Sequence, residues 1–341
     1  MNHLPTITIV TGTLNSNTLI FMRVLESIKA QQYPKKLIEH IVMDGGSTNG
    51  TIELAKKYQC TVFVRQGPVE QEQIRQSMGI KIAKGDMILI LESDNILPCN
   101  NWLLKLIQPF LDNKKVFCTF SAYNTYEKSM SLTTRYCALF GSPDPTLFYL
   151  NKTEKIRMDQ SHYNKGQIIQ ETNGYYIVKF TKDTLPTIGD NGHMFLKKAM
   201  MKVMKDPSQY THTDAFMQLL EFGYDTYGVV KNSIIHVMNP RILHLVMRRV
   251  EIKKRFYDGR RGQRKYLVFN PGSYKDWVNL IKYVMFALTF IIPFTESFRG
   301  YIKLKDLAWF LHPYVCFLMV VGYGRSEIER FFKKRLTTLF S

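Results

Sequence analysis

The fold is decided by residues 84–98, KGDMILILESDNILP, where an uninterrupted apolar run meets a pair of acidic residues. A Gly-Asp turn precedes residues 87–91, five consecutive apolar residues. Such a run is typical of a strand buried on both faces of a parallel sheet. Glu92 and Asp94 follow at the carboxyl end of this strand, and the two-residue period of a strand directs both carboxylates to the same side.

This acidic pair has two interpretations. In open α/β sheets, ligands bind outside the carboxyl ends of the strands. Mg²⁺ and Mn²⁺ prefer oxygen ligands and are commonly held there by one or two carboxylates together with phosphate oxygens. The same residues also suit an acidic turn, because residues 95–101 lead into a helical pattern that starts at Trp102. The stretch alone leaves both interpretations open.

Composition and charge limit the class of protein. The chain has 341 residues, of which 45% are hydrophobic and 22% charged, as expected for a packed globular protein of one large domain or two smaller ones. With 46 Lys and Arg against 28 Asp and Glu, the net charge is +18, which indicates an anionic partner: nucleic acid, an acidic membrane or a phosphorylated substrate.

The cysteines and the N-terminus bear on the compartment. Five cysteines lie far apart with no CxxC pair, so the sequence suggests neither a zinc site nor a disulfide framework, and a reducing compartment is expected. The first residues lack the basic region and long apolar core of a cleaved signal peptide, so none is expected.

Strand and helix patterns alternate through the first hundred residues. Strands are predicted at 5–11, 38–43, 61–65 and 87–91, and helices at 18–32, 52–58 and 71–83. This alternation predicts an α/β fold with a parallel, doubly wound sheet and right-handed crossovers.

Two further residues of this half suggest chemistry. Asp44 ends the second predicted strand and is followed by GGSTNGT. A carboxylate there can accept from a base N–H or a ribose hydroxyl, and the next helix N-terminus favours phosphate. An ordinary glycine-rich turn with Ser47 or Thr48 as N-cap is the alternative. Arg75 lies on the helix before the acidic strand. It is either a residue of the site or a solvated arginine on the protein surface.

Together these segments resemble glycosyltransferase family 2 of the bacterial, membrane-associated type. The enzymes of this family have the GT-A fold, a Rossmann-like, mostly parallel central sheet with flanking helices. The resemblance extends over about residues 5–100. The segments that carry it, in order, are TGTLN at 11–15, MDGGSTNGT at 43–51, IRQSMG at 74–79, AKGD at 83–86 and LESDN at 91–95.

The resemblance implies roles for individual residues. It implies that Asp44 contacts the nucleotide base, that Asp94 holds a metal on the diphosphate, and that Arg75 assists the phosphates. It also places Thr11, Asn15 and Ser93 among the donor-binding residues.

This sequence departs from the family pattern at three positions. Met43 replaces the first Asp of the DDGS motif, and Gln76 replaces the Asn that usually follows the helix arginine. Glu92 replaces the usual first Asp of the metal motif. Because Glu is longer than Asp, we expect Glu92 to meet a ribose hydroxyl or a metal-bound water and not the ion itself.

The second half adds a candidate base and a second metal ligand. Residues 189–198 resemble the family's acceptor-side strand, and residues 210–230 resemble its acidic pair, helix and strand. Thr213 stands at the first acidic position of that pair, and Asp214 is retained at the second. Asp214 is the predicted general base of an inverting transfer, although a helix N-cap fits equally well and both roles are compatible. His236 follows the strand predicted at 229–235 and is either a metal ligand or a structural histidine.

Residues 241–275 form a basic segment, with eleven Lys and Arg against two acidic residues. In relatives such a stretch closes over the diphosphate, so Arg248 and Arg249 are predicted phosphate ligands. A solvated basic helix or a membrane-surface patch is the alternative. The QxxRW motif of processive synthases is absent, which favours transfer of a single sugar.

Two apolar segments end the chain, at 277–294 and 307–323. Because about 20 apolar residues are needed to cross a bilayer, two spans, an interfacial or re-entrant hairpin, and a helical pair packed on the protein all stay open. Flanking Lys and Arg suit an anionic cytoplasmic leaflet. We therefore predict a catalytic domain at 1–240, a basic linker that covers the active site at 241–275, and a membrane-associated helical tail at 276–341.

The sequence thus predicts an inverting, hexosyltransferase-type enzyme that uses Mg²⁺ or Mn²⁺ and a nucleotide-sugar donor. Its predicted acceptor is a hydroxyl of a lipid-linked or cell-surface polysaccharide precursor, at the cytoplasmic face of the inner or plasma membrane. No nucleic acid partner is expected, because the positive charge lies beside an apolar tail. The alternatives are a sugar-phosphate nucleotidyltransferase, whose GxGxR loop is poorly matched, and a non-enzymatic basic protein docked on membranes.

Overall fold

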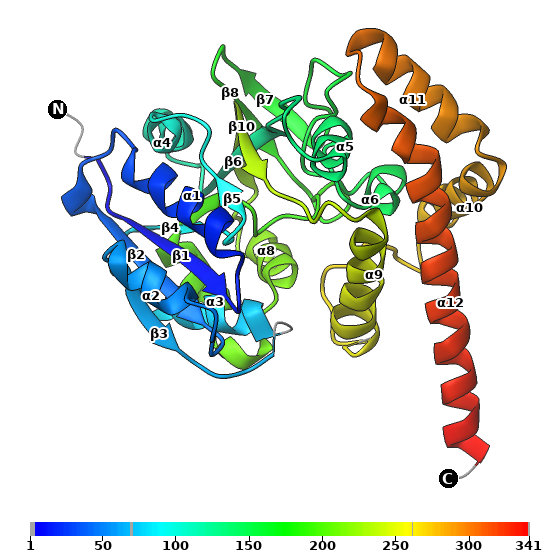
Figure 1. The fold of residues 1–341 in the computed structure, drawn as a ribbon, viewed down its shortest axis with the longest axis horizontal. Coiled ribbons are helices and arrows are strands. Elements are labelled where there is room, and N and C mark those ends of the chain that lie inside the picture. The colour runs from blue at the N-terminus through cyan, green and yellow to red at the C-terminus, as the bar shows by residue number, and fades with distance from the viewer. Residues whose placement is uncertain (1–3, 69–70, 261, 340–341) are drawn as a thin grey trace. The chain divides into compact units, whose positions relative to one another are not determined.

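The computed structural model describes residues 4–68, 71–260 and 262–339, which fold into two compact units (Figure 1). The first unit comprises Met1–Thr125 and His162–Val237, and the second comprises Tyr126–Ser161 and Met238–Ser341. The chain therefore leaves the first unit for good at 237, close to the predicted boundary at 240. The segment 126–161, predicted as part of the catalytic domain, folds instead with the C-terminal unit.

A ten-stranded sheet forms the centre of the first unit, in the order β3-β2-β1-β4-β9-β6-β10-β8-β7, with β5 paired to β10. Along this path only β9 and β8, of the strands in the described residues, run against the others. The predicted α/β fold with a mostly parallel sheet is confirmed. The strands are β1 Ile7–Thr13, β2 Ile38–Asp44, β3 Thr61–Val64, β4 Met87–Ile90, β5 Asn95–Ile96, β6 Cys118–Asn124, β7 Gln167–Glu171, β8 Tyr175–Lys179, β9 His193–Leu196 and β10 Thr226–His236.

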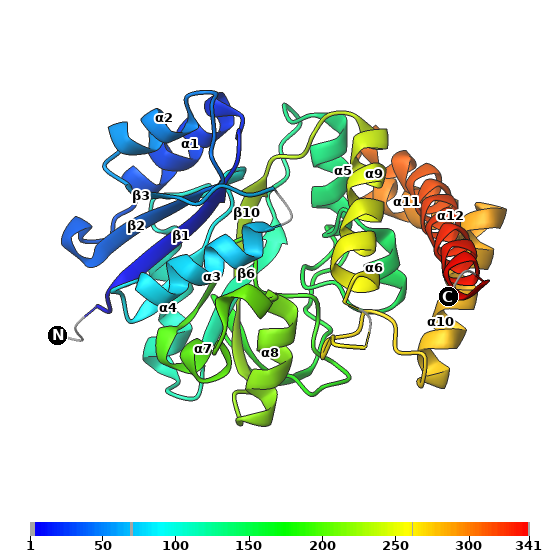
Figure 2. The same ribbon diagram turned by 90° about the horizontal axis from the view of Figure 1, so that it is seen from below.

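Helices cover this sheet on both faces. Figure 2 shows α1 and α2 on one face of the β1–β4 part and α3 on the other, as alternating strands and helices require. The helices of this unit are α1 Thr18–Lys29, α2 Thr51–Lys57, α3 Glu72–Ile82, α4 Trp102–Asp112, α7 Lys197–Val203 and α8 His212–Glu221.

The predicted elements are present, with ends shifted by one to three residues. Residues 87–91 are at most 5% exposed, which confirms the strand buried on both faces. The first strand was predicted to end at Thr11 but continues to Thr13, because its pairing with β2 extends to the pair Thr13–Asp44. This extension brings the ends of both strands to the same edge of the sheet.

The second unit is helical and built around a core that joins distant parts of the chain. Its helices are α5 Leu132–Phe140, α6 Pro145–Tyr149, α9 Ile242–Ile252, the π-helix η4 Lys253–Asp258, α10 Tyr274–Thr289, α11 Ile291–Lys303, the 3₁₀ turn η5 Leu307–Phe310 and α12 Leu311–Leu339. Tyr136 and Phe140 of α5 pack in one cluster with Trp309, Val315 and Met319 of the tail. This shared core explains why the segment 126–161 belongs to the C-terminal unit.

The two predicted apolar segments lie in these C-terminal helices. Leu307–Phe332 is long and apolar enough to cross a membrane, and 39% of its most apolar window is buried inside the protein. The pair α10 and α11 reaches that length only when both helices are counted together, and it is bent by 80°.

Candidate active site

Asp44 organises the loop at the carboxyl ends of β1 and β2. Its Oδ2 accepts hydrogen bonds from the hydroxyls of Thr13 and Ser47, both at 2.6 Å, and its Oδ1 accepts from the backbone N–H groups of Gly46 (2.8 Å) and Ser47 (2.6 Å). Burial raises the pKa of Asp44, but these hydrogen bonds together hold that pKa below its usual value. The four bonds use the accepting capacity of the carboxylate, so its direct effect is to fix this loop.

Asn15 continues the same network, whereas Thr11 lies inside the protein. The Asn15 N–H donates to Ser47 Oγ at 2.7 Å, and Asn15 Oδ1 accepts from the Thr48 N–H at 2.9 Å. Thr11 is fully buried, with its Oγ1 3.0 Å from His40 Nε2. Asn15 therefore lies at the predicted site, while the Thr11 side chain faces the sheet interior.

Ser93 connects this loop to the acidic stretch. Ser16 donates to Ser93 Oγ at 2.8 Å, and the Ser16 carbonyl accepts from Asn49 Nδ2 at 2.9 Å. The loops after β1, β2 and β4 thus meet at one edge of the sheet, as predicted for the site.

Arg75 is buried beneath the same loop, so the alternative interpretation as a solvated surface residue is excluded. It is 2% exposed, and its Nη1 donates to the carbonyls of Gly67 (3.2 Å) and Pro68 (2.9 Å). A Cβ atom added to Gly45 would lie 3.1 Å from Arg75 Cζ, so the glycine lets the loop approach the guanidinium. Within the described residues, the buried Nε of Arg75 has no hydrogen-bond partner, and burial lowers the pKa of the side chain.

Glu92 lies among other acidic side chains at the end of β4. Its Oε1 accepts from Gln76 Nε2 at 2.7 Å. Burial is the main cause that raises the pKa of Glu92 well above its usual value, and Glu72, Asp190 and Asp94 raise it further. A raised pKa weakens a carboxyl group as a ligand for a divalent cation, because the metal competes with the proton.

Asp94 and His236, the two predicted metal ligands, lie next to each other at this edge. The antiparallel pairing of β5 with β10 sets His236 opposite Asn95, and the Val237 N–H donates to the Asp94 carbonyl at 3.0 Å. Asp94 Oδ1 lies 3.7 Å from His236 Nε2, and the Asp94 side chain is 41% exposed. This exposure leaves the carboxylate accessible to a ligand.

The spacing of this pair fits a divalent cation that a bound substrate also coordinates. Adjacent ligands of an octahedral Mg²⁺ lie about 3 Å apart, close to the observed separation. No three His, Cys, Asp or Glu side chains in the described part of the chain gather closely enough to hold a metal alone. Two protein ligands leave the other positions to phosphate oxygens and water, as is usual for Mg²⁺.

Asp214 lies in the first turn of α8, where the helix dipole favours an ionised carboxylate. Thr211 Oγ1 donates to Asp214 Oδ2 at 2.8 Å. Two residues earlier, His212 Nε2 lies 3.9 Å from Asp190 Oδ2, and Asp190 is near enough to Glu92 to raise its pKa. These links place the start of α8 on the side of the sheet that carries the acidic stretch.

α3 supports both halves of this site. Gln76 holds Glu92, while Gln73 Oε1 accepts from the His212 N–H at 3.3 Å and Ser77 Oγ donates to the Pro207 carbonyl at 3.1 Å. The sequence reasoning did not identify Gln73, Asp190 or His212. Their positions in the sequence relative to the motifs do not indicate a role at the site, because only tertiary packing brings them to it.

Arg248 and Arg249 lie on α9 of the second unit. Arg248 is exposed and Arg249 is half-buried. Burial raises the pKa values of Cys137 and Tyr323, and the positive charge of Arg249 partly offsets both increases. Their role at the diphosphate stays a prediction.

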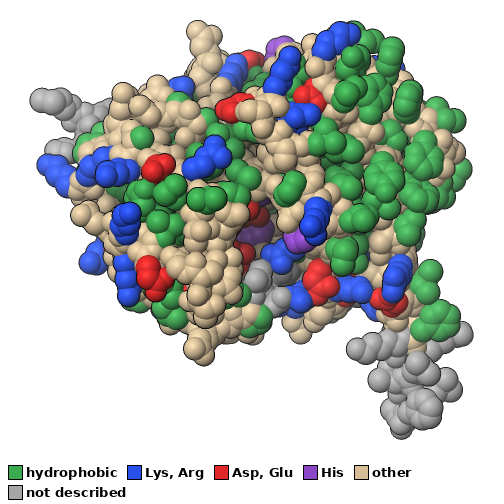
Figure 3. Space-filling model, in the orientation of Figure 1, with side chains coloured by type: hydrophobic (Ala, Val, Ile, Leu, Met, Phe, Trp, Pro, Cys, Tyr) green, Lys and Arg blue, Asp and Glu red, His purple; other side chains and the backbone are tan. Residues whose placement is uncertain are grey.

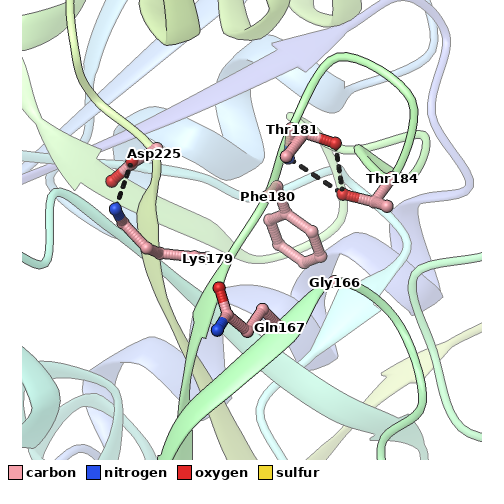
Figure 4. A pocket seen from close by; sticks show the side chains of 7 residues that line it. All are labelled: Gly166, Gln167, Lys179, Phe180, Thr181, Thr184 and Asp225. Carbon is pink, nitrogen blue, oxygen red and sulfur yellow. Dashed lines mark hydrogen bonds and ion pairs between the residues drawn. The ribbon is translucent and has the colours of Figure 1, made fainter.

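Two surface cavities lie away from these residues. One of about 310 Å³ lies beside β8, between Gly166, Phe180 and the ion pair of Lys179 with Asp225 at 3.0 Å (Figure 4). Another of about 670 Å³ is lined by Lys84, Met87 and their neighbours at the start of β4. Neither cavity contains a predicted site residue.

Comparisons with known proteins agree with this architecture. The structure is similar to that of the mannosyltransferase PcManGT from Pyrobaculum calidifontis, solved with GDP-Man and Mn²⁺, with 13% identity, a TM-score of 0.51, and coverage of 94% of this chain and 88% of that one. Glucosyl-3-phosphoglycerate synthase from Mycobacterium tuberculosis matches with 17% identity and a TM-score of 0.44, over 74% of this chain and 80% of that one. The comparison with curated protein sequences finds no significant match.

The family assignment comes from the sequence profile. The profile described as glycosyl transferase family 2 matches residues 8–185, more than half of the 341 residues. The matched range includes the Asp44 loop, Arg75 and the acidic stretch. This chain belongs to glycosyltransferase family 2.

Proposed function

We propose that this protein is an inverting, metal-dependent hexosyltransferase that moves one sugar from a nucleotide-diphosphate donor to an acceptor hydroxyl. The observation that carries the proposal is the Asp94–His236 pair, which lies at the sheet edge where the Asp44 loop and the start of α8 also lie. A carboxylate and an imidazole beside a glycine-rich strand-to-helix loop suit a nucleotide diphosphate with its cation.

On the donor side, the residues bind and orient. The Asp44 loop, tied to Asn15, would receive the nucleoside, and buried Arg75 would contribute positive charge beneath it. Asp94 and His236 would hold Mg²⁺ or Mn²⁺, which when bound supplies positive charge to the leaving diphosphate. The solved relative PcManGT binds GDP-Man and Mn²⁺ at a similar fold, which supports this choice of ligands.

On the acceptor side, Asp214 would act as the general base. The acceptor hydroxyl attacks the anomeric carbon and its proton passes to the Asp214 carboxylate, while the bond from that carbon to the diphosphate oxygen breaks. Because the group attacks opposite the leaving diphosphate, the configuration inverts. The position of Asp214 in the first turn of α8 supports the role, since the partial positive charge of a helix N-terminus stabilises a carboxylate.

The acceptor and the location follow from charge and hydropathy. We infer that the acceptor is a lipid-linked or cell-surface glycan precursor and that the enzyme works at the cytoplasmic face of an anionic membrane. The net charge of +18 and the apolar C-terminal helices support both inferences.

A thermal-shift panel of nucleotide sugars, with Mn²⁺, Mg²⁺ or EDTA, tests the proposal. A donor that binds only the folded state raises the unfolding temperature, so we expect one nucleotide sugar to do so strongly and only with metal. That donor is then offered to lipid-linked acceptors and the product is analysed for inverted configuration. If no nucleotide sugar stabilises the protein with either metal, the proposed function is wrong.

A further inference from the structure

An exposed apolar stripe runs along α10 and α11 of the second unit. On α10 it contains residues at spacings of three and four, which place them on one face of the helix. On α11 the same spacing recurs. The stripe consists of Tyr274, Trp277, Ile281, Met285 and Leu288 on α10, and of Ile291, Phe294, Phe298 and Ile302 on α11, all between 47% and 85% exposed. Figure 3 shows hydrophobic side chains gathered over this part of the molecule.

The opposite faces of both helices are already packed inside the unit. Tyr283 and Ala287 of α10 cluster with Cys316 of α12. Ser297 Oγ donates to the Trp309 carbonyl at 2.8 Å, and a Cβ on Gly300 would lie 2.5 Å from the Trp309 ring. The stripe is therefore a second apolar face, left over after the core is complete, and a soluble protein rarely exposes one of this extent.

The exposed charges beside the stripe are positive. Basic residues on these two helices and the turn after them are exposed: Lys275, Lys282, Arg299, Lys303 and Lys305. Of the acidic residues there, Glu296 lies 3.2 Å from His312 and Asp306 lies 3.0 Å from Arg135. Half-buried Asp276, at the start of α10, accepts from the Asn270 N–H at 2.8 Å. An apolar face with a positive border matches anionic lipid headgroups, whereas a second copy would bring the same positive charges against each other.

Neither helix is built to cross a bilayer. α10 has 16 residues and α11 has 13, so their lengths are about 24 Å and 20 Å at the usual rise of 1.5 Å per residue, short of the hydrocarbon core of about 30 Å. The 80° bend between them prevents the pair from forming one straight span. Each helix can lie with its stripe along the surface.

One face of α12 packs into the core of the unit, and 39% of its most apolar window is buried. Val315 and Met319 pack against Tyr136 of α5 and Leu245 of α9. Near the far end, Glu327 pairs with Lys253 at 2.5 Å. A bilayer around α12 would displace these partners or draw their charges into hydrocarbon, at a large cost.

We propose that α10 and α11 dock this enzyme on an anionic phospholipid surface as a bent pair, immersed in one leaflet with no helix crossing. Trp277 and Tyr274 then lie at the headgroup level, where aromatic residues are enriched. The inference concerns attachment only and holds whichever sugar is transferred.

Tryptophan fluorescence tests the proposal on the full chain. The protein has three tryptophans; Trp102 and Trp309 are fully buried, and Trp277 is 47% exposed. We expect vesicles of phosphatidylcholine and phosphatidylglycerol that contain brominated lipid to quench Trp277, and Trp277→Phe to lose that quenching. Vesicles of phosphatidylcholine alone should quench much less. Absence of quenching in anionic vesicles would overturn the proposal.

A depth probe separates docking from crossing. Leu288→Trp in the Trp277→Phe background puts a tryptophan beside the bend. A bent pair in one leaflet predicts stronger quenching by bromine near the carbonyl end of the acyl chain, whereas a single span would put this residue at the bilayer centre. Stronger quenching by bromine near the chain end would contradict the proposal.

Matched variants identify the surface. Met285→Gln with Phe298→Gln should weaken vesicle binding about tenfold or more, because buried apolar area sets interfacial affinity. Leu19→Gln with Phe222→Gln, which alters two exposed apolar residues of the first unit, should leave it unchanged. Circular dichroism checks the fold of both. If the stripe instead joins two copies, sedimentation shows a dimer without lipid that the stripe variant abolishes, and the proposal fails.

Discussion

The raised pKa of Glu92 has a measurable consequence for stability. Its folded pKa is raised above the usual 4.5, so the folded protein binds the proton more tightly than the unfolded chain. The resulting stabilisation is present below about pH 4.5 and is lost as the pH rises toward the folded pKa.

Glu92→Gln should therefore raise the unfolding temperature of the metal-free protein near pH 8 by about a few degrees and change it little near pH 4. Glutamine keeps the oxygen that accepts from Gln76 and cannot ionise. Exposed Glu53→Gln on α2 is the control. Equal shifts at both pH values would contradict the raised pKa.

Asp44 is expected to act through the loop that it holds. If Asn in its place turns its amide N–H₂ toward the backbone N–H groups of Gly46 and Ser47, both donors are left unsatisfied, at about 1–3 kcal/mol each. If it turns the N–H₂ toward the hydroxyls of Thr13 and Ser47, these must accept and not donate, and the stronger bonds to a charged carboxylate are lost in either case. We expect Asp44→Asn to lower the unfolding temperature and to weaken donor binding, as measured by calorimetry. Asp206→Asn removes the same kind of contact, to Ser208, in an exposed turn and should change neither.

At the scale of elements, Gly79 sets the distance between α3 and the sheet. A Cβ there would lie 2.6 Å from Val10 Cγ1 and 3.0 Å from Met43 Cγ. Gly79→Ala should destabilise the protein by about 1–3 kcal/mol and weaken donor binding, because α3 carries Arg75 and Gln76. Gly324→Ala in α12, where a Cβ meets nothing within 4 Å, should stabilise by about 0.5–1 kcal/mol. Denaturant unfolding of both variants measures these two changes in the free energy of unfolding.

The elements that the sequence predicted well are those with a strong local pattern. The apolar run of β4 and the motif around Asp94 were found because hydrophobic pattern and residue type are local information. The partnership of Thr13 with Asp44 was missed because it depends on the register of β1 against β2. The surroundings of Glu92 were missed because Glu72 and Asp190 reach it from distant segments.

At the scale of the whole molecule, the segment 126–161 depends on the C-terminal tail. The centre of the Phe140 ring lies 4.9 Å from that of Trp309 and 3.9 Å from that of His312. If the chain ends at 237, the aromatic residues of the segment therefore become exposed to solvent. This long-range pairing has no signature in the local sequence, so the predicted boundaries could not include it.

A chain that ends at residue 237 should therefore bind the dye ANS through the uncovered segment 126–161 and aggregate. Replacement of residues 126–161 by a short Gly-Ser linker in the truncated chain should restore solubility, which light scattering measures. A soluble, dye-free truncated chain that retains 126–161 would show that the segment folds without the tail.

The central claim is that Asp94 holds the donor with its cation and that Asp214 takes the acceptor proton. Donor-induced thermal shift and transfer rate, measured together on Asp214→Asn and Asp94→Asn, test it most directly. We predict that Asp214→Asn keeps the metal-dependent shift and loses about 10²–10⁴-fold in transfer rate, whereas Asp94→Asn loses the shift itself. Transfer by Asp214→Asn at the normal rate, or an undiminished metal-dependent shift in Asp94→Asn, would contradict the account.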